Sequence, residues 1–167
     1  PEVDALARSV LTAIGRDAVE KSDGAWSPKL GAMWRFSPAV AAYGQVARSY
    51  RAPNYNEVNG AFRNTVQSYG TSPNADLKPE TGIGGELGIK LTSGEWRAQV
   101  AVFDNHYKDF IESVYLSCPG DPRCISGLSR TSMAVNLDKV RIHGTEVRGG
   151  WAFAPGWHLD GSLARTV

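Results

Sequence analysis

The sequence lacks any apolar run of the roughly 18 residues that a transmembrane helix requires. It also lacks an excess of charge of either sign, because 18 lysines and arginines balance 17 aspartates and glutamates. No cluster of basic residues is dense enough to predict a nucleic-acid partner. The mean hydropathy is slightly negative, which fits a soluble domain but also a β-barrel, whose strands alternate apolar and polar residues. These absences exclude a helical membrane protein and a nucleic-acid-binding protein.

Cysteine is scarce as well, with only Cys118 and Cys124 in the segment SCPGDPRCIS. A structural metal site needs about four protein ligands, and this segment contains no histidine. The favoured interpretation is a small disulfide-closed loop in a location outside the cytoplasm. Two free thiols and a metal site remain the alternatives.

Catalytic motifs are missing too. The serines and histidines show no spacing that predicts a nucleophile with its base, and there is no glycine-rich phosphate loop. We therefore expect a protein that is not an enzyme.

Alternation of apolar and polar residues is the strongest signal that the sequence contains. It is clearest from Ile83 to Leu91, where leucine and isoleucine fall on one face and glutamate and lysine on the other. A strand of this kind has one apolar and one wet face. A short turn at 92–94 then leads into a second alternating strand, which predicts a hairpin. The same pattern predicts about six strands, near residues 26–36, 40–51, 81–92, 95–112, 135–153 and 157–167.

The predicted connections are short on one side of the strands and long on the other. Short turns fall near residues 37–39, 92–95 and 154–156. Long loops fall near residues 1–25, 52–80 and 113–134. This asymmetry is typical of outer-membrane barrels, and aromatic residues gather beside the short turns as in an interfacial girdle. They are Trp34, Phe36, Trp96, Trp151, Phe153 and Trp157.

We therefore predict an all-β fold, an antiparallel transmembrane β-barrel in contact with membrane lipid. A soluble β-sandwich with tryptophans in its core is the alternative, but it would not place every long loop on one side. About six strands cannot close a barrel, because the open edges would leave backbone groups unsatisfied in lipid. We expect the chain to be an excerpt of a longer polypeptide.

Several short motifs follow one another along the chain. They are SPKLG from Ser27, YRAP from Tyr50, NADLKPE from Asn74, DNHYKDFI from Asp104 and HGTE from His143. In this order they resemble the later strands of TonB-dependent outer-membrane receptors. The resemblance implies a 22-stranded barrel around an N-terminal plug, in the bacterial outer membrane. It also implies active import driven by the TonB complex of the inner membrane, acting on a plug that these residues do not include.

Within that family, the pairing of the YRAP and NADL boxes resembles haem and haemoglobin receptors, most closely a Phu-type haem receptor. The resemblance implies that haem, free or carried by a protein, is the transported ligand. Such receptors usually place a histidine between the two boxes, but residues 50–80 contain none. A tyrosinate also ligates haem iron, so Tyr69 is the candidate axial ligand. The other candidate haem contacts are Tyr55, Phe62, which is expected to stack on the porphyrin, and His106, near the outer rim.

The alternative function is a ferric-siderophore receptor, since related boxes occur there. In that case the loop tyrosines are ordinary contact or packing residues. An outer-membrane barrel enzyme and a passive porin are further alternatives, which the absence of a catalytic constellation and the long, motif-bearing loops disfavour.

Overall fold

The computed structural model describes residues 4–22 and 24–167. They form two compact units. The sheet unit comprises residues 26–49, 82–107 and 140–167, and the loop unit comprises residues 4–25 without Asp23, together with residues 50–81 and 108–139.

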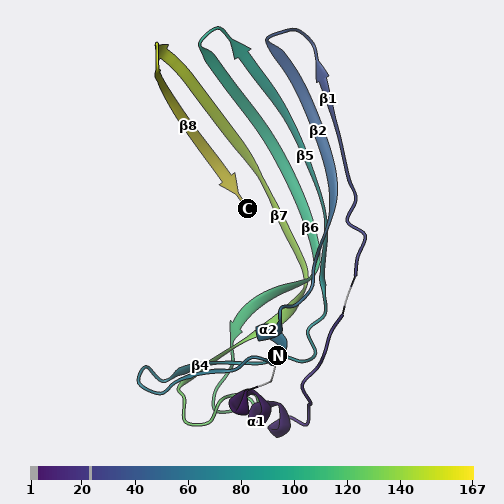
Figure 1. The fold of residues 1–167 in the computed structure, drawn as a ribbon, viewed down its shortest axis with the longest axis vertical. Helices are drawn as coiled ribbons and strands as arrows, with labels where there is room; N and C mark the ends of the chain where they lie inside the picture. Colours follow the sequence, from purple (N-terminus) through teal and green to yellow (C-terminus); the bar gives the residue numbers. More distant parts are fainter. Residues whose placement is uncertain (1–3, 23) are drawn as a thin grey trace. The chain divides into compact units, whose positions relative to one another are not determined.

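The sheet unit is built from long strands in the order β1-β2-β5-β6-β7-β8, and end segments of β2, β5, β6 and β7 belong to the loop unit (Figure 1). The strands are β1 (Lys29–Arg35), β2 (Val40–Arg51), β5 (Glu80–Ser93), β6 (Trp96–Tyr115), β7 (Arg130–Ala154) and β8 (Trp157–Thr166). Each of the strands predicted from the alternation has a counterpart here. The ranges differ most at β7, which begins at Arg130 instead of near residue 135, and at β1 and β6, since β1 begins at Lys29 and β6 continues to Tyr115.

Consecutive strands pair as antiparallel hairpins. Strand β1 pairs with β2 from Lys29 opposite Ala47 to Arg35 opposite Ala41. Strand β7 pairs with β8 in the same way, and Trp151 lies opposite Leu159. The short turns of the hairpins β1–β2, β5–β6 and β7–β8 lie at one end of the sheet unit (Figure 1). Gly94 and Gly156 supply left-handed backbone in two of these turns, with φ of +54° and +78°, which glycine adopts without strain.

The two faces of the sheet unit differ in polarity. Gln45, Glu86 and Asn105 line a cavity on one face. Side chains one residue away along the strands point to the other face, where leucine, isoleucine and valine are widely exposed. An apolar surface this continuous is unfavourable in water and is what a barrel presents to lipid.

Tyr43 of β2 lies across the polar face and contacts two further strands, β5 and β6. Its ring lies over Gly88, where an added Cβ would collide with the ring carbons. Its hydroxyl donates to Glu86 Oε1 at 2.6 Å and accepts from Gln99 Nε2 at 2.9 Å. Lys90 Nζ lies 5.1 Å from the ring centroid, within range of a cation–π contact. The absence of a side chain at position 88 is therefore what allows Tyr43 to lie flat and join β2, β5 and β6.

Aromatic residues pack together beside the short turns. The rings of Trp96 and Trp151 stack with centroids 4.8 Å apart, and Phe153 lies 5.4 Å from Trp151. Trp157 continues the row at 6.3 Å from Phe153. Large aromatic side chains exposed at one end of an apolar band match the interfacial girdle of outer-membrane barrels.

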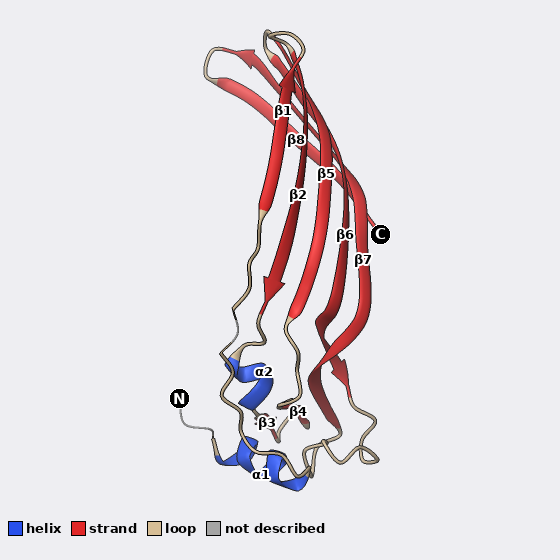
Figure 2. Ribbon diagram, turned by 90° about the vertical axis from the view of Figure 1, so that its right-hand side faces the viewer, coloured by secondary structure: helices blue, strands red, loops and turns tan. Residues whose placement is uncertain are grey.

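Within the segments predicted as long loops, the structure contains two helices and two short strands (Figure 2). Helix α1 (Ala5–Ala13) begins after Asp4, whose carboxylate accepts from Ala7 N at 2.8 Å. Helix α2 (Tyr55–Asn59) starts with a capping box between Asn54 and Glu57. Strands β3 (Phe62–Asn64) and β4 (Tyr69–Ser72) form a small antiparallel hairpin.

Strand β4 also pairs with β7, and this pair is parallel, with Tyr69 opposite Arg130 and Ser72 opposite Met133. The predicted loop 52–80 thus contains a helix and two short strands, and the β4–β7 pair departs from the predicted antiparallel pattern. Of the expected loop 1–25, residues 1–3 and 23 lie outside the described residues. Neither helix within residues 4–22 and 24–167 has the length and apolar character needed to cross a membrane.

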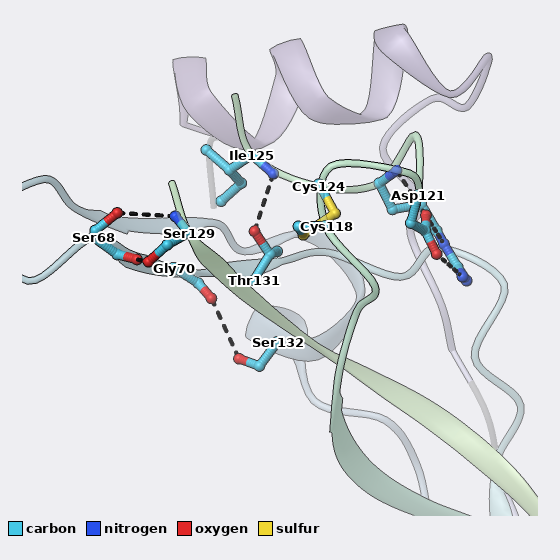
Figure 3. Close-up of a disulfide and its surroundings, with 10 residues drawn as sticks. Ser68, Gly70, Cys118, Asp121, Cys124, Ile125, Ser129, Thr131 and Ser132 are labelled. Carbon is cyan, nitrogen blue, oxygen red and sulfur yellow. Dashed lines mark hydrogen bonds and ion pairs between the residues drawn. A yellow bond between two sulfur atoms is a disulfide. The ribbon is translucent and has the colours of Figure 1, made fainter. Parts of the chain in front are cut away.

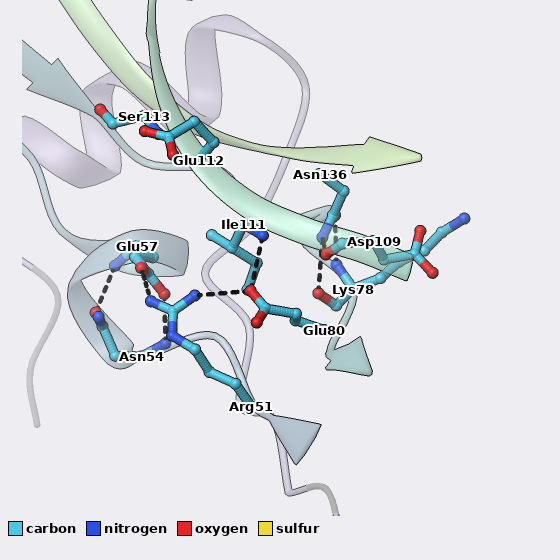
Figure 4. Close-up of polar contacts among 10 residues, drawn as sticks. All are labelled: Arg51, Asn54, Glu57, Lys78, Glu80, Asp109, Ile111, Glu112, Ser113 and Asn136. Atoms are coloured by element: carbon cyan, nitrogen blue, oxygen red, sulfur yellow. Dashed lines mark hydrogen bonds and ion pairs between the residues drawn. The ribbon is translucent and has the colours of Figure 1, made fainter. Parts of the chain in front are cut away.

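A small apolar core and a polar network hold the loop unit together. Val58, Leu77 and Ile111 are buried, with Val19 and Ala134 packed against them. The guanidinium of Arg51 lies between the carboxylates of Glu57 and Glu80 (Figure 4).

Asn136 makes a second set of hydrogen bonds in the loop unit. Its amide nitrogen donates to the carbonyls of Lys78, at 2.9 Å, and Asp109, at 2.7 Å, and its Oδ1 accepts from Lys78 N at 2.8 Å. Asp109 has a positive φ of 53°, so a side-chain bond to its carbonyl stabilises a backbone conformation that residues other than glycine rarely adopt.

Candidate ligand-binding site

The structure brings Tyr69 and Phe62 together on the β3–β4 hairpin. Their ring centroids lie 5.7 Å apart with the planes tilted by 48°. Neither ring is buried: Tyr69 is 38% exposed and Phe62 49%. A tilted aromatic pair that stays half in solvent offers apolar area to a ligand at little cost in conformational entropy.

Strand β7 adds a cation to this aromatic surface. Arg130 is paired with Tyr69 across the β4–β7 ladder, and paired residues point to the same face of a sheet. Tyr69 and Arg130, with Gln67 and Tyr115, line a cavity of about 580 Å³. We call these residues together with Phe62 the Tyr69 face.

The charge of Arg130 is not compensated within the described part of the chain. Three arginines of the loop unit have carboxylate partners, which are Asp76 for Arg16, Glu57 and Glu80 for Arg51, and Asp121 for Arg123. For Arg130 no carboxylate partner is found among residues 4–22 and 24–167. The Tyr69 face therefore combines exposed aromatic rings with a guanidinium that no carboxylate of the described residues neutralises, which suits a ligand that is both anionic and aromatic.

A disulfide joins Cys118 and Cys124 close to this hairpin (Figure 3). No free cysteine and no cluster of metal-ligating side chains occurs within the described ranges. Of the three interpretations of these cysteines, a disulfide, two free thiols or a metal site, the structure contains the disulfide.

An ion pair inside the disulfide loop is independent of pH over the physiological range. Hydrogen bonds from the Arg123 side chain and backbone lower the pKa of Asp121 to about 2. Because the pKa is lowered from 3.8, the stability that this pair contributes is present above about pH 3.8 and is lost as the pH falls towards 2.

The other candidate haem contacts lie elsewhere. Tyr55 is the first residue of α2. His106 belongs to β6 in the sheet unit, where its Nε2 lies 3.3 Å from Asp104 Oδ1. Asp104 also accepts two hydrogen bonds from Arg141, at 2.9 and 2.8 Å. His106 thus has an acidic partner on its own strand.

Arg130, Tyr115 and Gln67 are the residues of the Tyr69 face that the sequence does not predict. Arg130 is distant from the YRAP and NADL boxes in the sequence and becomes a neighbour of Tyr69 only through the parallel pairing. A basic residue at the start of a predicted strand is too common to be a signal on its own.

The sequence profile of the TonB dependent receptor-like β-barrel family matches residues 4–166. The iron-regulated outer membrane virulence protein of Vibrio cholerae is 32% identical over 142 residues, which cover 81% of this chain and 21% of that protein. The probable TonB-dependent siderophore receptor PirA of Acinetobacter baumannii is 33% identical, covering 61% and 15%. The hemoglobin and hemoglobin-haptoglobin-binding protein of Haemophilus ducreyi is 31% identical, covering 69% and 12%.

Solved structures show the same fold. The siderophore receptor PirA of Pseudomonas aeruginosa superposes with a TM-score of 0.69 at 21% identity, over 86% of this chain and 28% of that one. A mutant ferric enterobactin receptor of the same organism, in complex with enterobactin, gives 0.61 at 24% identity, over 86% and 22%. The chain thus spans about a fifth of the length of its first relative, 21%. It belongs to the TonB-dependent receptor family and forms part of the family's β-barrel in the bacterial outer membrane.

Proposed function

We propose that the chain is part of a receptor that imports a ferric siderophore through the outer membrane, driven by the TonB complex acting on a plug domain. The observation that carries this proposal is the guanidinium of Arg130, which has no carboxylate partner among the described residues, beside the exposed rings of Tyr69 and Phe62. Ferric complexes of catecholate siderophores are anionic and rich in aromatic rings. Such a ligand satisfies the free cation and covers the aromatic surface at the same time.

The relatives favour the same ligand class. PirA is named as a siderophore receptor, and two further relatives are named as enterobactin receptors. Import changes no bond in the substrate, so the proposed role is transport.

Haem import, the function that the boxes in the sequence predict, is the second candidate. A relative named for haemoglobin binding supports it, as does the exposed phenol of Tyr69, since tyrosinate is an established haem ligand. Haem is also anionic and aromatic, so the Tyr69 face suits it chemically. Tyr69 would then hold the iron, Phe62 would stack on the porphyrin, and Tyr55 and His106 would be secondary contacts.

Binding of ferric enterobactin to the intact receptor tests the proposal. Replacing Arg130→Ala is expected to raise the dissociation constant about tenfold, which is the effect of losing one charge-assisted interaction of about 1.4 kcal/mol. Arg8→Ala is the matched control, because Arg8 is an exposed arginine on α1 outside the Tyr69 face. The measurement is a fluorescence titration of purified receptor, with growth on the same ferric complex as sole iron source.

Titration with haemin separates the two candidates. A receptor that binds haemin but not ferric enterobactin, and whose haem absorption spectrum shifts in the Tyr69→Phe variant, would replace the siderophore proposal by the haem one. Equal loss of ferric enterobactin affinity in the Arg130 and Arg8 variants would remove the Tyr69 face from the proposal.

A further inference from the structure

The residues on both sides of Tyr69 contact one segment of the chain, residues 125–130. Ser68, on one side, has a left-handed φ of 53°, which is unfavourable for a residue other than glycine. Ser129 stabilises it with two bonds that involve side chains. Ser129 N donates to Ser68 Oγ at 2.9 Å, and Ser129 Oγ donates to the Ser68 carbonyl at 2.8 Å. Arg130 N donates to the same carbonyl at 3.2 Å.

Gly70, on the other side of Tyr69, is buried against the same segment (Figure 3). A Cβ at position 70 would meet Leu128 Cδ1 at 2.7 Å and Ile125 Cδ1 at 3.0 Å, and would also collide with the Phe62 carbonyl. Gly70 therefore faces Ile125 and Leu128, whereas Tyr69, the preceding residue of β4, points to the opposite face of the strand and stays exposed.

The disulfide holds the beginning of this segment in place. Ile125 directly follows Cys124, and its amide donates to Thr131 Oγ1 at 3.1 Å. Leu116 N, just before Cys118, donates to the carbonyl of the same Thr131 at 2.8 Å. Thr131 is fully buried. Both ends of the disulfide loop are thus fixed to one residue of β7, and the covalent closure reduces the conformations open to the chain between them.

We infer that Ser129 is a positioning residue for ligand binding, which acts through Ser68 on Tyr69, and that the Cys118–Cys124 disulfide supports it. The inference rests on the proposed function in taking the Tyr69 face as a ligand site. The ring of Tyr69 is held from the face opposite the ligand, so its orientation is set before the ligand arrives. Pre-orientation of a contact residue increases affinity because less freedom is lost on binding.

The experiment compares Ser129→Ala with Ser129→Thr in the intact receptor. Threonine keeps the donating hydroxyl and is the matched control. The alanine variant is expected to exchange the amide hydrogens of residues 68–70 about fivefold faster, in line with the loss of one net hydrogen bond, and the threonine variant to exchange at the wild-type rate. The double variant Cys118→Ser with Cys124→Ser should show the same acceleration.

Affinity for ferric enterobactin distinguishes an effect of Ser129 on the orientation of Tyr69 from a general stabilisation of the loop unit. Ser129→Ala is expected to raise the dissociation constant about fivefold, but to have no further effect when Tyr69→Ala has already removed the aromatic ring. Non-additivity of this kind shows that the two residues act on the same interaction.

Two results would overturn the inference. One is wild-type amide exchange at residues 68–70 in Ser129→Ala and in the double cysteine variant. The other is faster exchange in Ser129→Ala with an unaltered dissociation constant. If the wild-type receptor binds haemin and not ferric enterobactin, the proposed function fails. The same comparison with haemin then decides the inference.

Discussion

Val100→Arg is expected to lower the free energy of unfolding of the receptor in lipid by about 2–4 kcal/mol. This is the cost of a cation on the lipid face of a barrel near the bilayer midplane. Val100 lies on the apolar face of β6 and is 45% exposed. It lies beyond Trp96 by about 13 Å along the strand, at about 3.3 Å per residue, which places it near the middle of an apolar band about 25 Å tall. The measurement is denaturant unfolding of the intact receptor in bilayers.

Gln99→Arg is the matched control, since residue 99 precedes Val100 on the same strand and points to the opposite face. Gln99 lines a cavity on the polar face and donates to the Tyr43 hydroxyl. Its replacement should cost only about 1 kcal/mol, the net value of that hydrogen bond. Equal costs for the two arginines would contradict the assignment of one face to lipid and the other to the lumen.

Replacement of Leu77 by alanine is expected to destabilise the loop unit by about 3 kcal/mol, within the range for leucine truncation in a packed core. Leu77 is 1% exposed and packs with Val58 and Ile111. These contacts join the NADLKPE motif to α2 and β6, so the cavity would loosen all of them. The measurement is native-state hydrogen exchange of the intact receptor, which reports local opening separately from unfolding of the barrel.

Val66→Ala serves as the comparison for this truncation. Val66 also lies in the predicted loop 52–80 but is 94% exposed, so its truncation should change the opening free energy by less than about 0.5 kcal/mol. If Leu77→Ala left amide exchange in residues 54–60 at the wild-type rate, the loop unit would not depend on this core.

The strands and turns could be predicted from the sequence because their signal is local. Alternation from Ile83 to Leu91 is visible in a few consecutive residues, and Gly94 marks the turn that follows. The family was also predictable, since its motifs, such as YRAP and NADLKPE, are contiguous in the chain.

The interior of the loop unit could not be predicted in the same way. The short strand β4 carries no periodic pattern of its own and forms only because β3 and β7 supply partners on its two sides. Tyr69 and Phe62 were identified from the sequence as candidate haem contacts, and that role remains a prediction. Arg130 was missed, because its place beside Tyr69 depends on a pairing between distant segments.

The ring of Tyr43 occupies the space that a side chain at position 88 would need, so the residues allowed at position 88 depend on the residue at position 43. A larger residue at position 88 becomes tolerable only after position 43 has become smaller. Loss of Tyr43 in turn deprives Glu86 and Gln99 of a shared hydrogen-bond partner. Change on this part of the polar face must therefore proceed through coordinated substitutions, in which the order of steps decides which intermediates still fold.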